Sequence, residues 1–189
     1  MRTIVTVASL FFALAANAQE SPAETQSIRC GALAHILTVI ATPPAFNETM
    51  GHSAMFYSDV FGALKEVRTG AAGTNGETFA RRDTIEAELR RTWPVKPEAV
   101  IREMALCNTW RAEYAPRLAA VNGGTGTGND VVEALGLPPT APRPGEADMW
   151  RPIVTTGFAA WVESGSKTGG ETRALIKKQL EDSIKLKQR

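Results

Sequence analysis

The chain has few of the side chains on which enzyme chemistry most often depends. Its 189 residues include only two histidines, His35 and His52, and two cysteines. A catalytic triad therefore has few candidate bases, and the wide spacing of the cysteines excludes a CxxC redox motif. Long apolar runs are also missing beyond residue 18, so we expect no transmembrane span after that point. The scarcity of these side chains favours a non-catalytic protein over an enzyme.

An excess of charge of one sign is missing as well. The chain carries 21 Lys and Arg against 20 Asp and Glu, a formal net charge of +1. General nucleic-acid binders depend on a net basic field, so we expect no nucleic acid among the partners. Hydrophobic residues make up 43% of the chain, which is enough for a packed core.

The N-terminus has the pattern of an export signal. Arg2 gives a positive start, residues 4–15 are predominantly apolar, and Ala16-Asn17-Ala18 places small side chains at a signal peptidase site. This order predicts a signal peptide over residues 1–18. The product would be secreted, or periplasmic if the host is Gram-negative, and loss of Arg2 would leave it formally neutral.

The two cysteines, Cys30 and Cys107, form an even pair in a chain that we expect to meet an oxidising compartment. Such a pair favours one disulfide, with two buried thiols as the alternative. Each cysteine lies in the apolar stripe of an expected helix, the first and the fourth. A bridge would therefore join these helices through the core.

Apolar residues recur at helical spacing in four successive segments of residues 19–121. Ser21 and Glu24 form a capping box at the first start. The spacing predicts an all-α fold with a four-helix bundle-like core. The expected helices begin at Ser21, near Asn47, at Glu77 and at Pro97. The first three are expected to end at Pro43, at Gly70 and at Trp93-Pro94. Pro116 is expected to end or kink the fourth.

The remaining residues predict a linker and an extension. Residues 122–147 are rich in glycine and proline, with one or two helical turns expected near Val131. Residues 148–189 predict a two-helix extension that packs on the bundle. Asp148 would cap its first helix, and the second would cover about 171–187. The basic face of that second helix could bind anionic lipid or a partner's groove. Basic residues in its last turn also complement the helix dipole, however, so we favour a solvated helix.

One short cluster suggests metal chemistry. Met50-Gly51-His52-Ser53-Ala54-Met55 offers two thioethers and an imidazole, which are ligands suited to Cu(I). Met50, His52 and Met55 could converge only if residues 50–52 were not helical. The alternative is that both methionines fill gaps in the core.

Carboxylates give no comparable signal. Glu86, Glu88, Glu98 and Glu103 fall on helix faces that we interpret as solvated, and His35 reads as a packed or rim histidine. A hydrolase would need a concave site that brings distant acidic residues together. Nothing in the sequence predicts one.

The sequence thus favours an exported, non-catalytic binding or interaction protein of the cell envelope, such as a chaperone, an inhibitor or an immunity-type factor. Its partner would be a protein or a small ligand there. Trp150 and Trp161 are the first candidates for a partner surface, because indole rings are enriched at binding hot spots. A periplasmic Cu(I)-binding protein is the alternative. No motif is specific enough to indicate a family.

Overall fold

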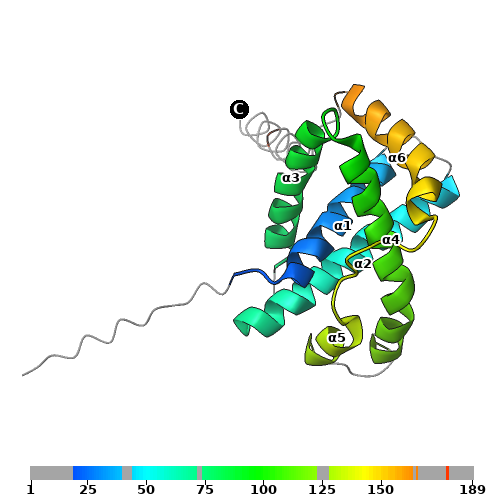
Figure 1. Ribbon diagram of the computed structural model, residues 1–189. Helices are drawn as coiled ribbons and strands as arrows, with labels where there is room; N and C mark the ends of the chain where they lie inside the picture. Colours follow the sequence, from blue (N-terminus) through cyan, green and yellow to red (C-terminus); the bar gives the residue numbers. More distant parts are fainter. Residues whose placement is uncertain are drawn as a thin grey trace, which may run out of the picture.

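The computed structural model describes residues 19–39, 44–71, 74–122, 128–163, 165 and 178. The predicted signal peptide lies outside this description, and so does the predicted helix over 171–187 apart from residue 178. Within it the chain forms six helices and no strand, so the all-α prediction is confirmed (Figure 1). The helices are α1 (Pro22–Val39), α2 (Pro44–Thr69), α3 (Asn75–Thr92), α4 (Pro97–Asn122), α5 (Gly128–Leu135) and α6 (Glu146–Glu163).

Local sequence signals set two helix starts. The capping box of α1 is present: the backbone N–H of Ser21 donates to Glu24 Oε2 at 2.8 Å, and the N–H of Glu24 donates to Ser21 Oγ at 3.1 Å. A second box, formed by Thr74 and Glu77, starts α3 at Asn75. Glu77 is the third residue of that helix rather than its start, because the cap lies three residues before it.

Three of the expected helix boundaries differ in the structure, two of them at prolines. α2 begins at Pro44 instead of near Asn47, as a proline is well tolerated in the first turn of a helix. α4 continues through Pro116 to Asn122; the proline is exposed and leaves only the final turns beyond it. α6 begins at Glu146, two residues before the expected cap Asp148.

α1 is the central helix of the fold. It packs against α2, α3, α4 and α6, while α2 and α4 also hold α5 between them (Figure 1). A helix with partners on several sides must be apolar around most of its circumference. The residues of α1 follow that rule, since the buried ones include Ile28, Cys30, Ala32, Leu33, Ala34, Ile36 and Leu37.

The predicted disulfide joins α1 to α4. Cys30 and Cys107 are bonded with their Cα atoms 5.4 Å apart, and both are at most 1% exposed. α2 is tied to the same point, because the Tyr57 hydroxyl donates to the backbone carbonyl of Cys107 and its ring lies 5.9 Å from that of Trp110. Burial raises the pKa of Tyr57 well above its ordinary value, so the hydroxyl keeps its proton and acts as a donor.

α6 is held by an aromatic cluster. Phe158 is fully buried, with its ring centroid 5.1 Å from that of Trp93 and 5.7 Å from that of Trp161. The Arg90 guanidinium lies 4.2 Å from the Trp161 ring centroid, in a cation–π arrangement. The cluster thus fixes α6 to the end of α3.

α5 belongs to the packed structure although it lies in the segment predicted as a linker. Leu135 is 1% exposed, and Val131 and Val132 pack against the core. Gly136 then ends the helix with φ +58°, and a Cβ there would lie 3.1 Å from the Tyr114 ring. Glycine is required at this position both by the left-handed backbone and by the closeness of that ring.

Candidate functional site

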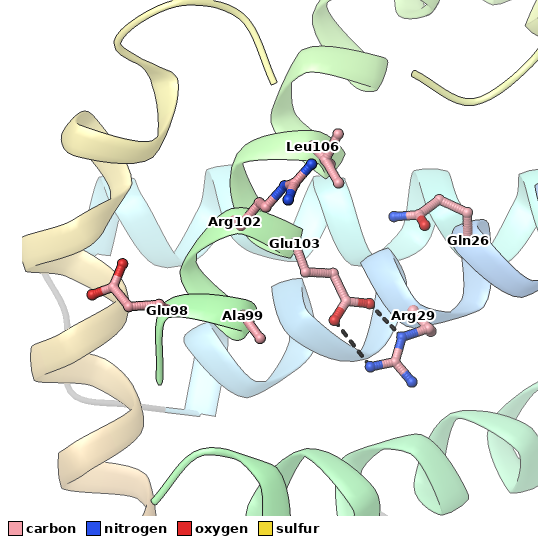
Figure 2. Close-up of a pocket in the computed structure, with 7 residues that line it drawn as sticks. All are labelled: Gln26, Arg29, Glu98, Ala99, Arg102, Glu103 and Leu106. Carbon is pink, nitrogen blue, oxygen red and sulfur yellow. Dashed lines mark hydrogen bonds and ion pairs between the residues drawn. The ribbon is translucent and has the colours of Figure 1, made fainter. Parts of the chain in front are cut away.

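A shallow groove of about 570 Å³ lies between α1 and α4 (Figure 2). The disulfide sets its register: Gln26 lies one turn before Cys30 and Glu103 one turn before Cys107. The groove is lined by two residues of α1 and five of α4, namely Gln26, Arg29, Glu98, Ala99, Arg102, Glu103 and Leu106.

Arg29 connects the two walls of the groove. Its Nε and Nη2 donate to the two carboxylate oxygens of Glu103, the latter at 2.9 Å, and its Nη1 donates to Glu88 Oε1 of α3 at 3.0 Å. The hydrogen bonds that Arg29 donates to Glu103 are the main reason why the pKa of Arg29 is raised, and they outweigh the opposing effect of burial. A bidentate guanidinium–carboxylate pair also fixes orientation, so these side chains hold α1, α3 and α4 in register.

The second acidic residue of the groove, Glu98, is paired as well. Its carboxylate accepts from Arg151 Nη1 of α6, and Arg151 lies 3.9 Å from Asp148. Glu98 lies at the α6 end of the groove, opposite Gln26 (Figure 2). Because Glu98 and Glu103 are both bound to arginines, neither is presented as a general base, and the groove gives no support to a carboxylate hydrolase.

Arg102 differs from the other charged residues of the groove. It is exposed and, among the described residues, makes no hydrogen bond or ion pair. The groove surface beside it is formed partly by the apolar side chains of Ala99 and Leu106. Arg102 is therefore the positive charge that the groove can offer to another molecule.

The interpretation of Glu86 as a solvated residue is wrong. Its side chain is 2% exposed, because this face of α3 lies against α1. Glu86 Oε1 lies 2.7 Å from His35 Nδ1 and 3.4 Å from Arg82 Nε. These two partners offset the energetic cost of burying the carboxylate. His35, with 26% of its side chain exposed, is the rim histidine that we expected, now with a partner that orients its ring.

The structure does not bring together the three residues of the copper hypothesis. Residues 50–55 are helical throughout, so the condition for convergence is not met. Met50 is 3% exposed and belongs to the core, whereas Met55 is 65% exposed and His52 is also exposed. Met50 and Met55 thus lie on different faces of α2.

The tryptophans considered as a partner surface are packed inside. Trp150 is 5% exposed and Trp161 is 2% exposed, so neither indole offers an open face in this conformation. The residues that do line an open surface, Gln26, Arg29 and Arg102, were not singled out by the sequence. The disulfide was the signal that could have found them, because pairing Cys30 with Cys107 places the preceding turns of both helices side by side.

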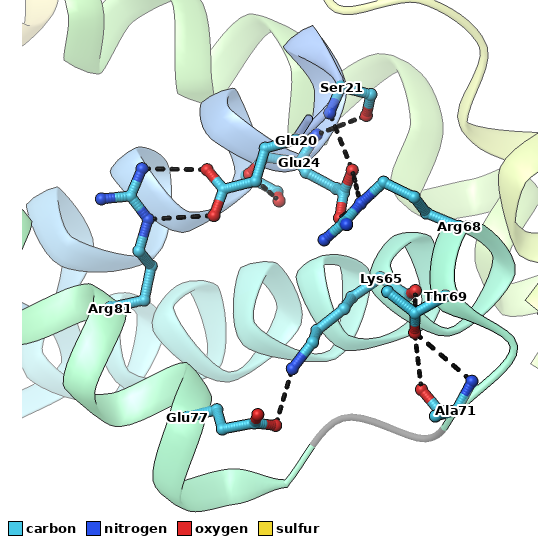
Figure 3. A network of polar contacts seen from close by, with 10 residues as sticks. Glu20, Ser21, Glu24, Lys65, Arg68, Thr69, Ala71, Glu77 and Arg81 are labelled. Atoms are coloured by element: carbon cyan, nitrogen blue, oxygen red, sulfur yellow. Dashed lines mark hydrogen bonds and ion pairs between the residues drawn. The ribbon is translucent and has the colours of Figure 1, made fainter. Parts of the chain in front are cut away.

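Ion pairs also fix the N-terminal ends of α1 and α3 (Figure 3). Arg81 donates to both oxygens of Glu20, and Arg68 donates to Glu24, which is 1% exposed. On the surface Lys65 reaches Glu77 at 2.6 Å; its hydrogen bond, with those of Thr74, lowers the pKa of Glu77 to about 2. These contacts tie the start of the described chain to α2 and α3.

Glu146 joins the start of α6 to α4. Its carboxylate accepts hydrogen bonds from Asn108, from Arg143 Nη2 at 2.8 Å and from Trp150 Nε1 at 3.1 Å. Burial acts to raise the pKa of Glu146, but these hydrogen bonds and the charge of Arg143 outweigh it, so the pKa lies below its ordinary value.

Acid should therefore release this contact. A carboxyl whose pKa is lower in the folded state stabilises the fold above its unfolded-state value of 4.5, and the contribution is lost as the pH falls through the folded-state pKa. Urea unfolding at pH 7 and at acidic pH measures the effect in the wild type and in Glu146→Gln. We expect the difference in unfolding free energy between the two proteins to shrink at acidic pH. A difference that does not change with pH would contradict this role.

None of the helices that the structure describes combines the length and apolar character needed to cross a membrane. Among the residues that the structure describes, no three histidine, cysteine, aspartate or glutamate side chains lie together in a way that could hold a metal ion. Comparison of the chain with protein families, with curated proteins and with solved structures finds no match in any of the three.

Proposed function

We propose that this protein is an exported, non-catalytic interaction module of the cell envelope, of the chaperone, inhibitor or immunity type, and that the groove between α1 and α4 contacts its partner. The observation that carries the proposal is Arg102, an exposed guanidinium without a partner among the described residues, beside the apolar side chains of Ala99 and Leu106. Arginine is one of the residues most enriched at binding hot spots.

The frame around Arg102 supports this reading. The Arg29–Glu103 pair joins α1 to α4 within the groove and the buried disulfide joins the same two helices beside it, so the walls of the groove are fixed before any partner arrives. A preorganised surface loses less conformational entropy on binding than a mobile one. The groove is open rather than enclosed, whereas small-molecule sites bury most of their ligand. A protein partner that presents a carboxylate beside a small apolar side chain therefore fits best.

Site-directed photo-crosslinking in the export compartment tests the proposal. A photoreactive residue replaces Ala99 in the groove or, as a control, Ala112, which is exposed on α4 but does not line the groove. We expect a discrete protein adduct from position 99 and none from position 112. The mass of the recovered chain shows at the same time whether residues 1–18 have been removed.

Arg102 variants then test the charge. Arg102→Glu should abolish the adduct from position 99, because it places a carboxylate opposite the carboxylate of the partner. Its thermal stability should stay unchanged, since Arg102 is exposed. Equal adducts from positions 99 and 112, no adduct at all, or an adduct that survives Arg102→Glu would contradict the groove as the contact face.

A further inference from the structure

The sulfur atoms of the disulfide lie directly behind one side chain of the groove. Gln26 lines the groove, and its Nε2 lies 3.4 Å from Cys30 Sγ and 3.7 Å from Cys107 Sγ. Neither cysteine lines the groove itself, and both are at most 1% exposed. Gln26 therefore stands between the solvent in the groove and both sulfur atoms.

The contacts that hold Gln26 in this place are weak. Disulfide sulfur is a poor hydrogen-bond acceptor, and both distances are long for a strong bond. By contrast, the neighbouring Arg29 is held by two carboxylates. The long, unbranched Gln26 side chain can thus rotate into the groove at little cost, while the walls on either side stay fixed.

We propose that the groove admits a dithiol reductant to the Cys30–Cys107 bridge in the folded protein, and that Gln26 controls this access. A thiolate of the reductant attacks one bridge sulfur and forms a mixed disulfide, and the other sulfur leaves as a thiolate that takes up a proton. The second thiol of the reductant, as its thiolate, then attacks the mixed disulfide. The bridge is reduced to two cysteine thiols, and the reductant is oxidised to its own disulfide.

The structure gives Gln26 two opposing effects on this reaction. Its bulk shields both sulfur atoms, whereas its Nε2–H can donate to the departing thiolate. Leucine keeps most of the bulk without the donor, and alanine removes both. The two substitutions therefore separate access from hydrogen bonding. This inference does not depend on the proposed partner, because the reaction is measured with a small dithiol alone.

The test is the rate at which dithiothreitol reduces the bridge in the folded protein as it is recovered after export. Aliquots are quenched with an alkylating reagent, and mass spectrometry counts the modified thiols at several urea concentrations below the unfolding transition. We expect the wild type to be reduced at a rate that does not depend on the urea concentration, because no global unfolding is needed. Gln26→Ala should accelerate reduction by about tenfold, and Gln26→Leu should match the wild type or be slower.

Other results would overturn the proposal. If reduction of the wild type and Gln26→Ala accelerates with urea in step with unfolding, the bridge is reached only in the unfolded chain. If Gln26→Leu is as fast as Gln26→Ala, the bulk of the side chain does not control access. If no reduction occurs in the folded protein, the groove does not admit the reductant. Circular dichroism during the reaction checks that each variant remains folded.

Discussion

Replacing Cys30 and Cys107 together by alanine is expected to lower the free energy of unfolding by about 4.5 kcal/mol, the value that chain entropy gives for a bridge of this span. The cysteines are 77 residues apart, so the bridge removes a large part of the freedom of the unfolded chain. It also joins two of the helices that enclose the core, and both cysteines are buried there. For a domain of this size the loss corresponds to a fall in Tm of roughly 9–18 °C.

Thermal unfolding followed by circular dichroism, with and without reductant, measures this effect. The wild type should be reduced in denaturant and refolded under reducing conditions, so that access to the bridge does not limit the comparison. Reduced wild type and the double variant should then unfold at similar temperatures, both well below the oxidised protein. A double variant with the Tm of the oxidised protein would show that the bridge contributes little.

Phe158→Ala is the second large effect, with an expected loss of about 3–5 kcal/mol in the free energy of unfolding. Phe158 is fully buried between Trp93 and Trp161, so alanine leaves a cavity that these large rings cannot easily fill. The loss should be concentrated at α6, because the aromatic cluster fixes that helix to the end of α3.

Met149→Ala is a matched control for this substitution on the same helix. Met149 is 53% exposed, so its truncation removes little buried surface and should change stability by no more than about 0.5 kcal/mol. Urea unfolding gives both values, and hydrogen exchange shows where protection is lost. Similar losses for the two variants would mean that the aromatic cluster does not anchor α6.

Signals that act within one helix could be predicted from the sequence. The capping box of Ser21 and Glu24 starts α1, and Pro97 opens α4 as expected. In both cases, the residues concerned or their immediate neighbours in the chain carry the physical cause. The disulfide was predicted from the even number of cysteines and the expected oxidising compartment, and its place in the core from the apolar stripe around each cysteine.

Contacts between helices were harder to predict. Glu86 lies on a polar helix and reads as solvated, yet it is buried because α1 presents His35 to that face. The groove joins Gln26 to residues more than seventy positions away, and only the pairing of the nearby Cys30 with Cys107 could have indicated that contact. Met50 and Met55 are close in sequence but lie on different faces, because the helix continues through them.

The central place of α1 also has a consequence for the order in which the chain can fold. α1 is the first of the described helices, yet it packs against α6, which ends at Glu163. During synthesis α2 follows α1 directly and can cover one side of it, but the face of α1 that packs against α6 must wait for a helix that emerges much later. Contacts of such long sequence separation form slowly. Until α6 has been made, that face of α1 is exposed to aggregation, and a factor that binds the nascent chain would have its greatest effect there.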